Sequence, residues 1–213
     1  MKVKLNQNKI AEAIAKNSKM TNFIRKEVYS LVEEYVEKNK QEMLNEYKNH
    51  PVTKEIENGP EASNISNTLA GQGNLFSYIG FEEGSNPTEA VKEILENSVK
   101  ISNKPDISVN NKNLKINFSV SGPTLEEIES VTPMPFEGGR SWVRGIEKGI
   151  SGFSYYIFRK FIKNSRSSTG IQSESEVRSG SFKPTPYMKQ ILKKFYSKVN
   201  IKINVWSHNL KIF

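Results

Sequence analysis

The sequence predicts an α+β fold: a long N-terminal helix packed on a small antiparallel β-sheet, with further short helices and extended arms. Three observations predict it. Apolar residues recur with a helical period between Thr21 and Tyr47, residues on both sides of 110–113 alternate with period two, and capping residues precede several short apolar segments. A chain of 213 residues is long enough for one domain, which we place over 1–213.

The long helix is predicted from the spacing of its apolar residues. Ile24, Val28, Leu31 and Tyr35 stand at i, i+4, i+7 and i+11, so they share one helical face. The opposite face is rich in Glu and Lys and no heptad is sustained, which favours a helix lying across a sheet over a coiled coil. The helix should end at Asn49-His50-Pro51, because a residue before proline is driven out of the α region.

Residues 51–74 are rich in Gly, Asn and Ser, and we expect an extended loop or arm there. The apolar run LFSYIGF at 75–81 predicts a strand. A helix from Pro87 to Asn97 follows, because Asn86 is a good N-cap and proline suits the first helical position.

Residues 106–109 and 114–120 alternate around the Asn- and Lys-containing turn at 110–113, which predicts a β-hairpin. Thr124 and Glu127 have the spacing of a capping box, which predicts that a short helix begins there.

The C-terminal third should hold a helix over 141–150, a strand over 153–162 and a helix that Thr185 caps and Pro186 starts. The apolar face of that last helix comprises Tyr187, Met188, Ile191, Leu192, Phe195 and Val199. The tail 199–213 alternates like a strand; it is either a final edge strand or an arm that completes a neighbour's sheet.

The charge of the chain is divided along its length. The net charge is +8, yet the segment from Arg140 onward has 15 Lys and Arg against three Glu, while the part before it has 16 basic and 20 acidic residues. Such a division suits head-to-tail contact between copies, or binding of nucleic acid by the basic half, or merely a well-solvated surface.

The composition also excludes several classes of protein. Without cysteine there is no disulfide scaffold and no thiolate zinc site. The N-terminus is too polar for a secretory signal and no run of about 18 apolar residues exists, so we expect a soluble protein with no membrane partner.

Catalytic chemistry finds little support. Asp106 is the one aspartate, and Pro105-Asp106 with Asn113-Leu114-Lys115 resembles a metal-dependent nuclease pattern in which Asn113 stands where an acid is needed. Phosphate-binding glycine motifs are absent. We therefore predict no enzyme and no catalytic, cofactor-binding or metal-binding residues.

Aromatic and basic residues interleave over 155–166, with Tyr155, Tyr156, Phe158 and Phe161 among Arg and Lys. The pattern suits stacking on single-stranded nucleic acid, but a strand buried on both faces explains it more simply.

The stretch GGRSWVRGIEKGISGFSYYIF supplies a candidate interface. Gly145, Gly149 and Gly152 stand at i, i+4 and i+7, so in a helix they would leave one smooth face for an element of this chain or of the next copy. Trp142 and Ile146 lie on other faces and would anchor the helix to the core. The predicted interface residues are Gly145, Gly149, Gly152, Trp142 and Arg144.

The stretches HPVTKEIENGP, NTLAGQGNLFSYIGFEEGSNP, GRSWVRGIEKGISGFSYYIF, SRSSTGIQ and VRSGSFKPTPYMKQILKKF, read in order, resemble the tail-completion, or minor capsid and head–tail joining, proteins of tailed bacteriophages. The resemblance covers about residues 20–198; the extreme N-terminus and the tail 199–213 have no counterpart.

The resemblance implies a long N-terminal helix leading into a small antiparallel sheet. It also implies a structural virion protein, assembled in the host cytoplasm, that forms a homo-oligomeric ring at the neck between portal and tail. Its partners would be other neck, portal or tail proteins, with non-specific contact to packaged DNA and no catalytic residues to carry over. The alternative from the residues themselves is a basic nucleic-acid-binding module.

Overall fold

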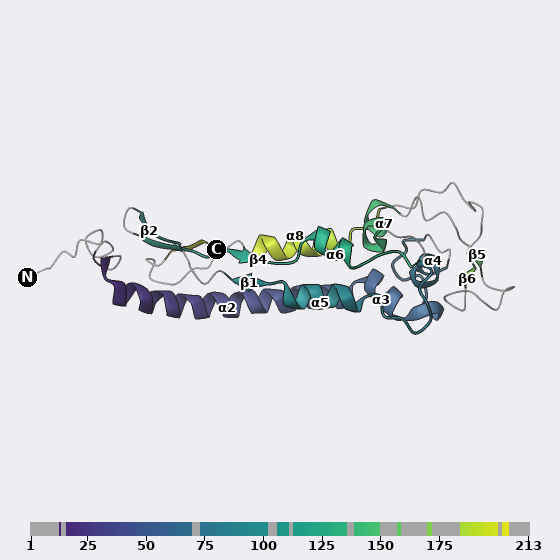
Figure 1. The fold of residues 1–213 in the computed structure, drawn as a ribbon, viewed down its shortest axis with the longest axis horizontal. Helices are drawn as coiled ribbons and strands as arrows, with labels where there is room; N and C mark the ends of the chain where they lie inside the picture. Colours follow the sequence, from purple (N-terminus) through teal and green to yellow (C-terminus); the bar gives the residue numbers. More distant parts are fainter. Residues whose placement is uncertain are drawn as a thin grey trace, which may run out of the picture. The chain divides into compact units, whose positions relative to one another are not determined.

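The structure is a computed structural model, and helices make up most of its described part (Figure 1). It describes residues 13, 16–69, 73–101, 106–110, 113–135, 139–149, 157–158, 170–171, 184–199 and 202–204. The helices are α2 (Ser18–Asn49), α3 (Pro51–Glu57), the 3-10 helix η1 (Gly59–Glu61), α4 (Leu75–Ile79), α5 (Glu89–Asn97), α6 (Leu125–Ser130), α7 (Trp142–Lys148) and α8 (Met188–Val199). The long N-terminal helix and the small antiparallel strand pairing are confirmed, but the fold is more helical than predicted.

The chain separates into two compact units, which we describe one at a time. Unit 1 comprises Met1–Gln41, Val99–Gly122 and Phe195–Phe213, and unit 2 comprises Glu42–Ser98 and Pro123–Lys194. Helices α2 and α8 each continue from one unit into the other. The single domain over 1–213 stays a prediction.

Unit 1 contains the predicted hairpin. Strands β2 (Asp106–Asn110) and β3 (Asn113–Asn117) pair antiparallel, with Asp106 opposite Asn117. The second strand stops at Asn117, whereas we predicted Val120, because β4 (Val120–Ser121) pairs with β1 (Lys100–Ile101) instead.

Part of the C-terminal tail also joins this hairpin. Strand β7 (Lys202–Asn204) pairs antiparallel with β3, so the strand order is β2-β3-β7. Residues 202–204 therefore form an edge strand in their own chain, which agrees with the first of the two alternatives predicted for the tail. The rest of 199–213 beyond Val199 lies outside the described residues.

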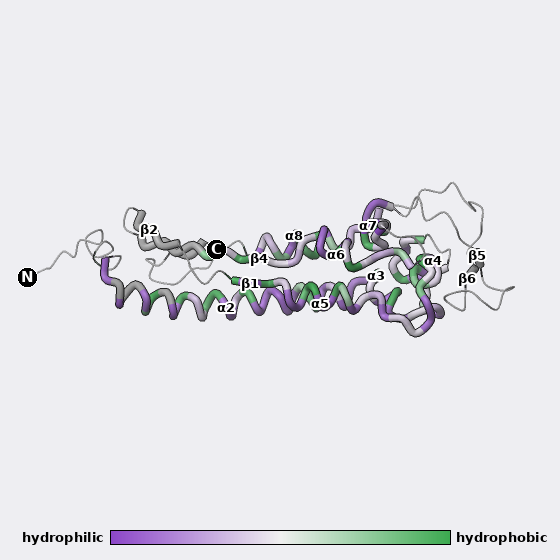
Figure 2. The backbone as a smooth tube through the Cα atoms, in the orientation of Figure 1, coloured by the Kyte–Doolittle hydropathy of each residue, from purple (hydrophilic) through white to green (hydrophobic). Residues whose placement is uncertain are grey.

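The buried face of α2 differs from the predicted one. Val28 is buried as expected, but the stripe continues through Val32 and Val36, while Leu31 is 42% exposed. In an α-helix, a step of four residues returns to within about 40° of the starting direction, whereas a step of three leaves about 60°. Val32 therefore lies closer to the face of Val28 than Leu31 does, and it occupies the buried position predicted for Leu31. Figure 2 shows hydrophilic and hydrophobic residues alternating along this helix.

In unit 2, the segment predicted as a loop at 51–74 begins with a helix. His50 accepts a hydrogen bond from the backbone N–H of Val52 and so caps α3, and Pro51 occupies its first turn. The buried carboxylate of Glu55 accepts from the backbone N–H groups of Ser66 and Leu75, both at 2.8 Å. The Gly/Asn/Ser composition misled the prediction, because these tertiary contacts hold the segment against α3.

The predicted strand at 75–81 is also wrong, since residues 75–79 form α4. The Asn74 side chain accepts from the N–H of Ser77 at 2.9 Å, and Gly80 ends the helix with φ of +83°. The periodicity of a short apolar run does not distinguish a strand from a helix. The caps at Asn74 and Gly80 are what favour the helix here.

Three further helices lie where the sequence predicted them. Helix α5 nevertheless begins at Glu89 after Thr88, whose side chain makes no capping hydrogen bond, so the predicted cap at Asn86 and the predicted start at Pro87 are wrong. Helix α5 buries Val91 and Leu95 completely, and α6 has the predicted capping box between Thr124 and Glu127. All six residues predicted for the apolar face of the last helix are buried. The cap predicted at Thr185 is wrong, however, because α8 begins only at Met188 and the Thr185 hydroxyl lies 3.2 Å from that of Thr68.

The core of unit 2 centres on the buried side chain of Tyr187. Its ring lies 6.2 Å from that of Tyr47, 4.7 Å from His50 and 6.5 Å from Trp142. Its hydroxyl is hydrogen-bonded to that of Thr53 at 2.8 Å. Burial raises the Tyr187 pKa well above its usual range, so the hydroxyl stays neutral.

We predict that Tyr187→Phe destabilises the protein by about 1–2 kcal/mol, because the buried Thr53 hydroxyl loses its partner. Thr53→Val together with Tyr187→Phe should cost less than the sum of the single changes, since no polar group is then left unpaired. Urea denaturation of the four proteins measures this coupling. Strictly additive losses would show that the hydrogen bond contributes nothing.

Candidate interface around helix α7

Helix α7 is fixed at its start by the segment that follows α6. Ser141 caps it by accepting from the N–H of Arg144 at 3.1 Å, and the Ser141 hydroxyl lies 2.7 Å from the hydroxyl of Thr132. The backbone N–H of Trp142 donates to the Thr132 carbonyl at 2.8 Å. These bonds confirm a helix start at 141–142 and attach α7 to the end of α6.

The three glycines of the predicted interface do not share a helical face. Gly145 lies inside α7, but the helix ends at Lys148, and Gly149 follows it with φ of +78° and ψ of 102°. Gly152 lies outside the described residues. The regular i, i+4, i+7 spacing suggested a longer helix, whereas Gly149 adopts a conformation that L-residues avoid and so stops it. A role of these residues in an interface stays a prediction.

Trp142 and Arg144 have different surroundings. Trp142 is 1% exposed and its ring meets Phe81 edge-on at 5.9 Å, so it anchors α7 to the core as expected for a residue off the glycine face. Arg144 is exposed, and its guanidinium lies 3.7 Å from the Glu129 carboxylate. Of the two, only Arg144 presents its side chain at the surface.

Helix α8 receives its N-terminal partner from α7. The Glu147 carboxylate accepts from the backbone N–H of Lys189 at 2.6 Å, and the Thr185 N–H donates to the Ile146 carbonyl at 3.1 Å. Burial raises the Glu147 pKa, and the hydrogen bond from Lys189 opposes that rise. A carboxylate at a helix N-terminus is favourable. Glu147 therefore accepts the hydrogen bond from the first turn of α8 that the sequence analysis had assigned to Thr185 as N-cap.

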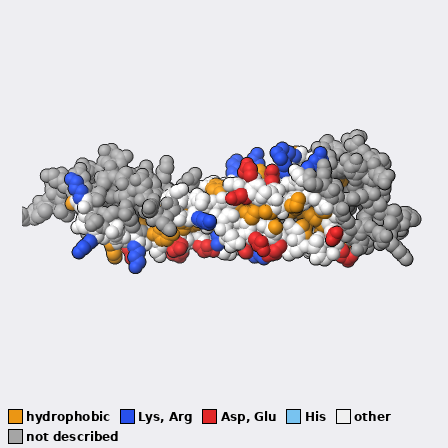
Figure 3. Space-filling view, viewed as in Figure 1, with side chains coloured by type: hydrophobic (Ala, Val, Ile, Leu, Met, Phe, Trp, Pro, Cys, Tyr) orange, Lys and Arg blue, Asp and Glu red, His pale blue; other side chains and the backbone are white. Residues whose placement is uncertain are grey.

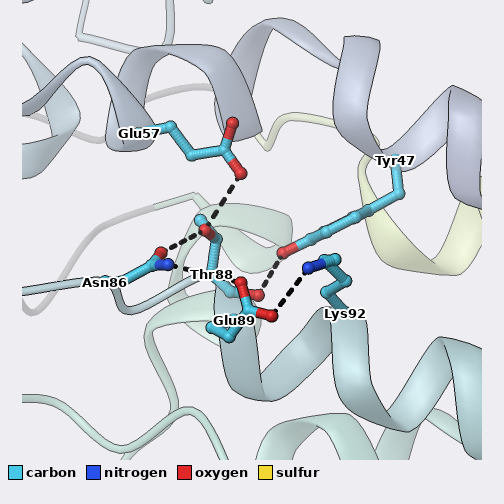
Figure 4. A network of polar contacts seen from close by, with 6 residues as sticks. All are labelled: Tyr47, Glu57, Asn86, Thr88, Glu89 and Lys92. Atoms are coloured by element: carbon cyan, nitrogen blue, oxygen red, sulfur yellow. Dashed lines mark hydrogen bonds and ion pairs between the residues drawn. The ribbon is translucent and has the colours of Figure 1, made fainter.

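A second polar network attaches α5 to the ends of α2 and α3 (Figure 4). The buried Tyr47 hydroxyl donates to the Thr88 carbonyl at 2.8 Å, and the Thr88 hydroxyl donates to Glu57 at 3.1 Å. Lys92 pairs with Glu89 at 2.7 Å beside them. The network thereby brings the acidic side chains of α3 and α5 together.

Charge is segregated over unit 2. Figure 3 shows Lys and Arg side chains along the upper edge, over α7 and α8, with some acidic side chains among them, and mostly acidic side chains along the opposite edge, over α3 and α5. We define the basic face as Arg140, Arg144, Lys148, Lys189, Lys193 and Lys194, and the acidic face as Glu57, Glu82, Glu83, Glu89, Glu93 and Glu96. Sequence analysis identified the acidic part of the chain before Arg140 but not that Glu57 of α3 lies beside the start of α5, because 31 residues separate Glu57 from its partner Thr88.

The pattern that resembled a nuclease is not assembled. Asp106 and Asn113 lie at opposite ends of the β2–β3 hairpin, since Asp106 pairs with Asn117 and Asn113 with Asn110. Across the described residues, no group of three or more His, Asp or Glu side chains is arranged to hold a metal ion. The same residues include no helix that could span a membrane.

Part of the basic and aromatic segment cannot be compared with its prediction. Within 153–162, Ile157–Phe158 form β5, which pairs antiparallel with β6 (Gly170–Ile171). The other residues of the predicted strand lie outside the described residues. Comparison with protein-family models, curated proteins and solved structures gave no match.

We predict that Gly149→Ala destabilises the protein by about 1–3 kcal/mol, because φ is positive at this helix end. Gly145→Ala is the matched control inside α7, where alanine should be neutral or stabilise by up to about 1 kcal/mol. Thermal or urea unfolding compares the two. Equal destabilisation by both would instead indicate close backbone packing along the glycines.

His50 should make the stability depend on pH. Burial lowers the His50 pKa below its usual value, although a backbone hydrogen bond with Pro186 and the Glu46 charge oppose this. The folded state then binds fewer protons than the unfolded state, so stability should fall as pH is lowered from about 7 to about 5.

His50→Asn replaces the Nδ1 acceptor of the α3 cap with an amide oxygen and removes the titration. Urea denaturation at both pH values should therefore show a smaller loss for this variant than for the parent. An identical loss in both proteins would rule out His50 as its source.

Proposed function

We propose that this protein is a structural subunit of a tailed-phage virion that forms a ring at the neck, where it joins the portal or connector to the tail. The main observation behind the proposal is that the stretches that resemble tail-completion and head–tail joining proteins pack against one another. Four of them each contribute one ring to a single cluster: His50, Phe81, Trp142 and Tyr187. The fifth, SRSSTGIQ, lies mostly outside the described residues.

The cluster connects these four stretches in space. His50 touches Tyr187, Tyr187 touches Trp142, and Trp142 touches Phe81, so residues from four separate segments build one core. Phe81, Trp142 and Tyr187 are buried. These residues stabilise the unit, and the proposed role itself rests on the resemblance and on the charge distribution.

The charge distribution supports assembly from identical copies. An acidic and a basic face on different sides of one unit allow a heterologous contact, in which each copy uses one face toward each neighbour. Such a contact gives a ring when the rotation between copies closes, as the neck of a virion requires.

The alternative function is a nucleic-acid-binding module, which the exposed basic face of α7 and α8 favours. Both functions predict attraction to DNA at low salt. They differ in whether the protein associates with itself.

Native mass spectrometry and negative-stain electron microscopy of the purified protein over a range of concentrations test the proposal. We expect closed rings, formed alone or on addition of portal or tail proteins from the same phage. A strict monomer that binds neither would contradict the proposal. A monomer that binds DNA with strongly salt-dependent affinity would favour the alternative.

A further inference from the structure

We infer that the basic face on α7 and α8 docks onto the acidic face of a second copy of this chain. The inference rests on the proposed function, because it names the two surfaces through which a ring of copies would close. The contact it describes uses the exposed charged side chains of unit 2 and not the glycine face predicted from sequence.

The basic face is presented by two helices that are fastened together. The bonds from Lys189 N–H to Glu147 and from Thr185 N–H to the Ile146 carbonyl join the end of α7 to the start of α8. Arg144 and Lys148 are spaced i, i+4 on α7, and all six Lys and Arg side chains of the face are exposed. A face held this way presents its charges in a fixed arrangement.

The acidic face is likewise held by contacts within unit 2. Glu89, Glu93 and Glu96 are spaced i, i+4, i+7 along α5, so they share one side of that helix. Glu57 joins them from α3, where its carboxylate accepts from Thr88 at the start of α5 (Figure 4). Glu82 and Glu83 precede α5 in the chain and are exposed, and we assign them to the same face.

A second copy fits the basic face better than a phosphate backbone does. Glu147, Glu129 and Glu46 stand beside the basic residues, as their contacts with Lys189, Arg144 and Lys194 show. Over its whole sequence unit 2 contains 15 Lys and Arg against 17 Glu, so its net charge is −2. Because carboxylates lie among the basic residues, we assign the face to the separate acidic groups of a second copy rather than to the continuous charge of a phosphate backbone.

Charge reversal tests this pairing in the full-length protein. The basic-face variant is Lys148→Glu with Lys193→Glu, and the acidic-face variant is Glu82→Lys with Glu93→Lys; all four side chains are exposed. Lys26→Glu with Lys38→Glu, and Glu33→Lys with Glu34→Lys, are matched controls on exposed positions of α2. Circular dichroism and thermal unfolding confirm that each variant folds.

Each face variant alone should weaken self-association about tenfold or more in sedimentation or native mass measurements, because like charges then oppose each other at the contact. The controls should associate like the parent. A mixture of the two face variants should assemble again with the copies alternating, since each reversed face then meets its complement on both sides.

Four outcomes would overturn the inference. Face variants that associate like the parent, or losses that mixing does not rescue, would show that rings close through other surfaces while leaving the proposed function intact. A basic-face variant that loses retention of a DNA duplex without any change in self-association would assign the face to nucleic acid. A parent protein that never associates, alone or with neck proteins, would overturn the proposed function as well.

Discussion

Unit 2 depends on the burial of Tyr187. The residue stands just before α8, and its ring lies against Tyr47 from α2, His50 from the α2–α3 junction and Trp142 from α7. Its hydroxyl needs a partner once it leaves water, and the Thr53 hydroxyl supplies one. One side chain therefore holds together the α2–α3 junction, α7 and the start of α8, which are far apart in sequence.

The same packing determines which polar groups face water. Tyr47, Thr88 and Glu55 have hydrogen-bond partners inside the unit, so the interior needs no ligand to satisfy them. The other described Lys, Arg and Glu side chains of the unit are exposed or half-buried, because burying an unpaired charge is costly. Since α3 and α5 hold mostly acids and α7 and α8 mostly bases, the unit has two faces of opposite sign, on which its proposed assembly depends.

Sequence reasoning succeeded where a local hydrogen bond or a sustained period determines the structure. The capping box at Thr124 and the alternation around 110–113 needed only neighbouring residues, and both are present. It failed at 51–57, 75–79 and Gly149. There, either a tertiary contact such as that of Glu55 or a single backbone conformation outweighed composition and spacing.

The sequence by itself determined the long helix, the hairpin, the apolar face of α8 and the concentration of basic charge after Arg140, because each depends on residues close together in the chain. Only the tertiary structure decided that Glu147 accepts a hydrogen bond at the start of α8, that Tyr187 packs against His50 and Trp142, and that Glu57 lies beside the start of α5. These features pair residues that the chain separates by dozens of positions, and no periodicity or local propensity encodes such a pairing.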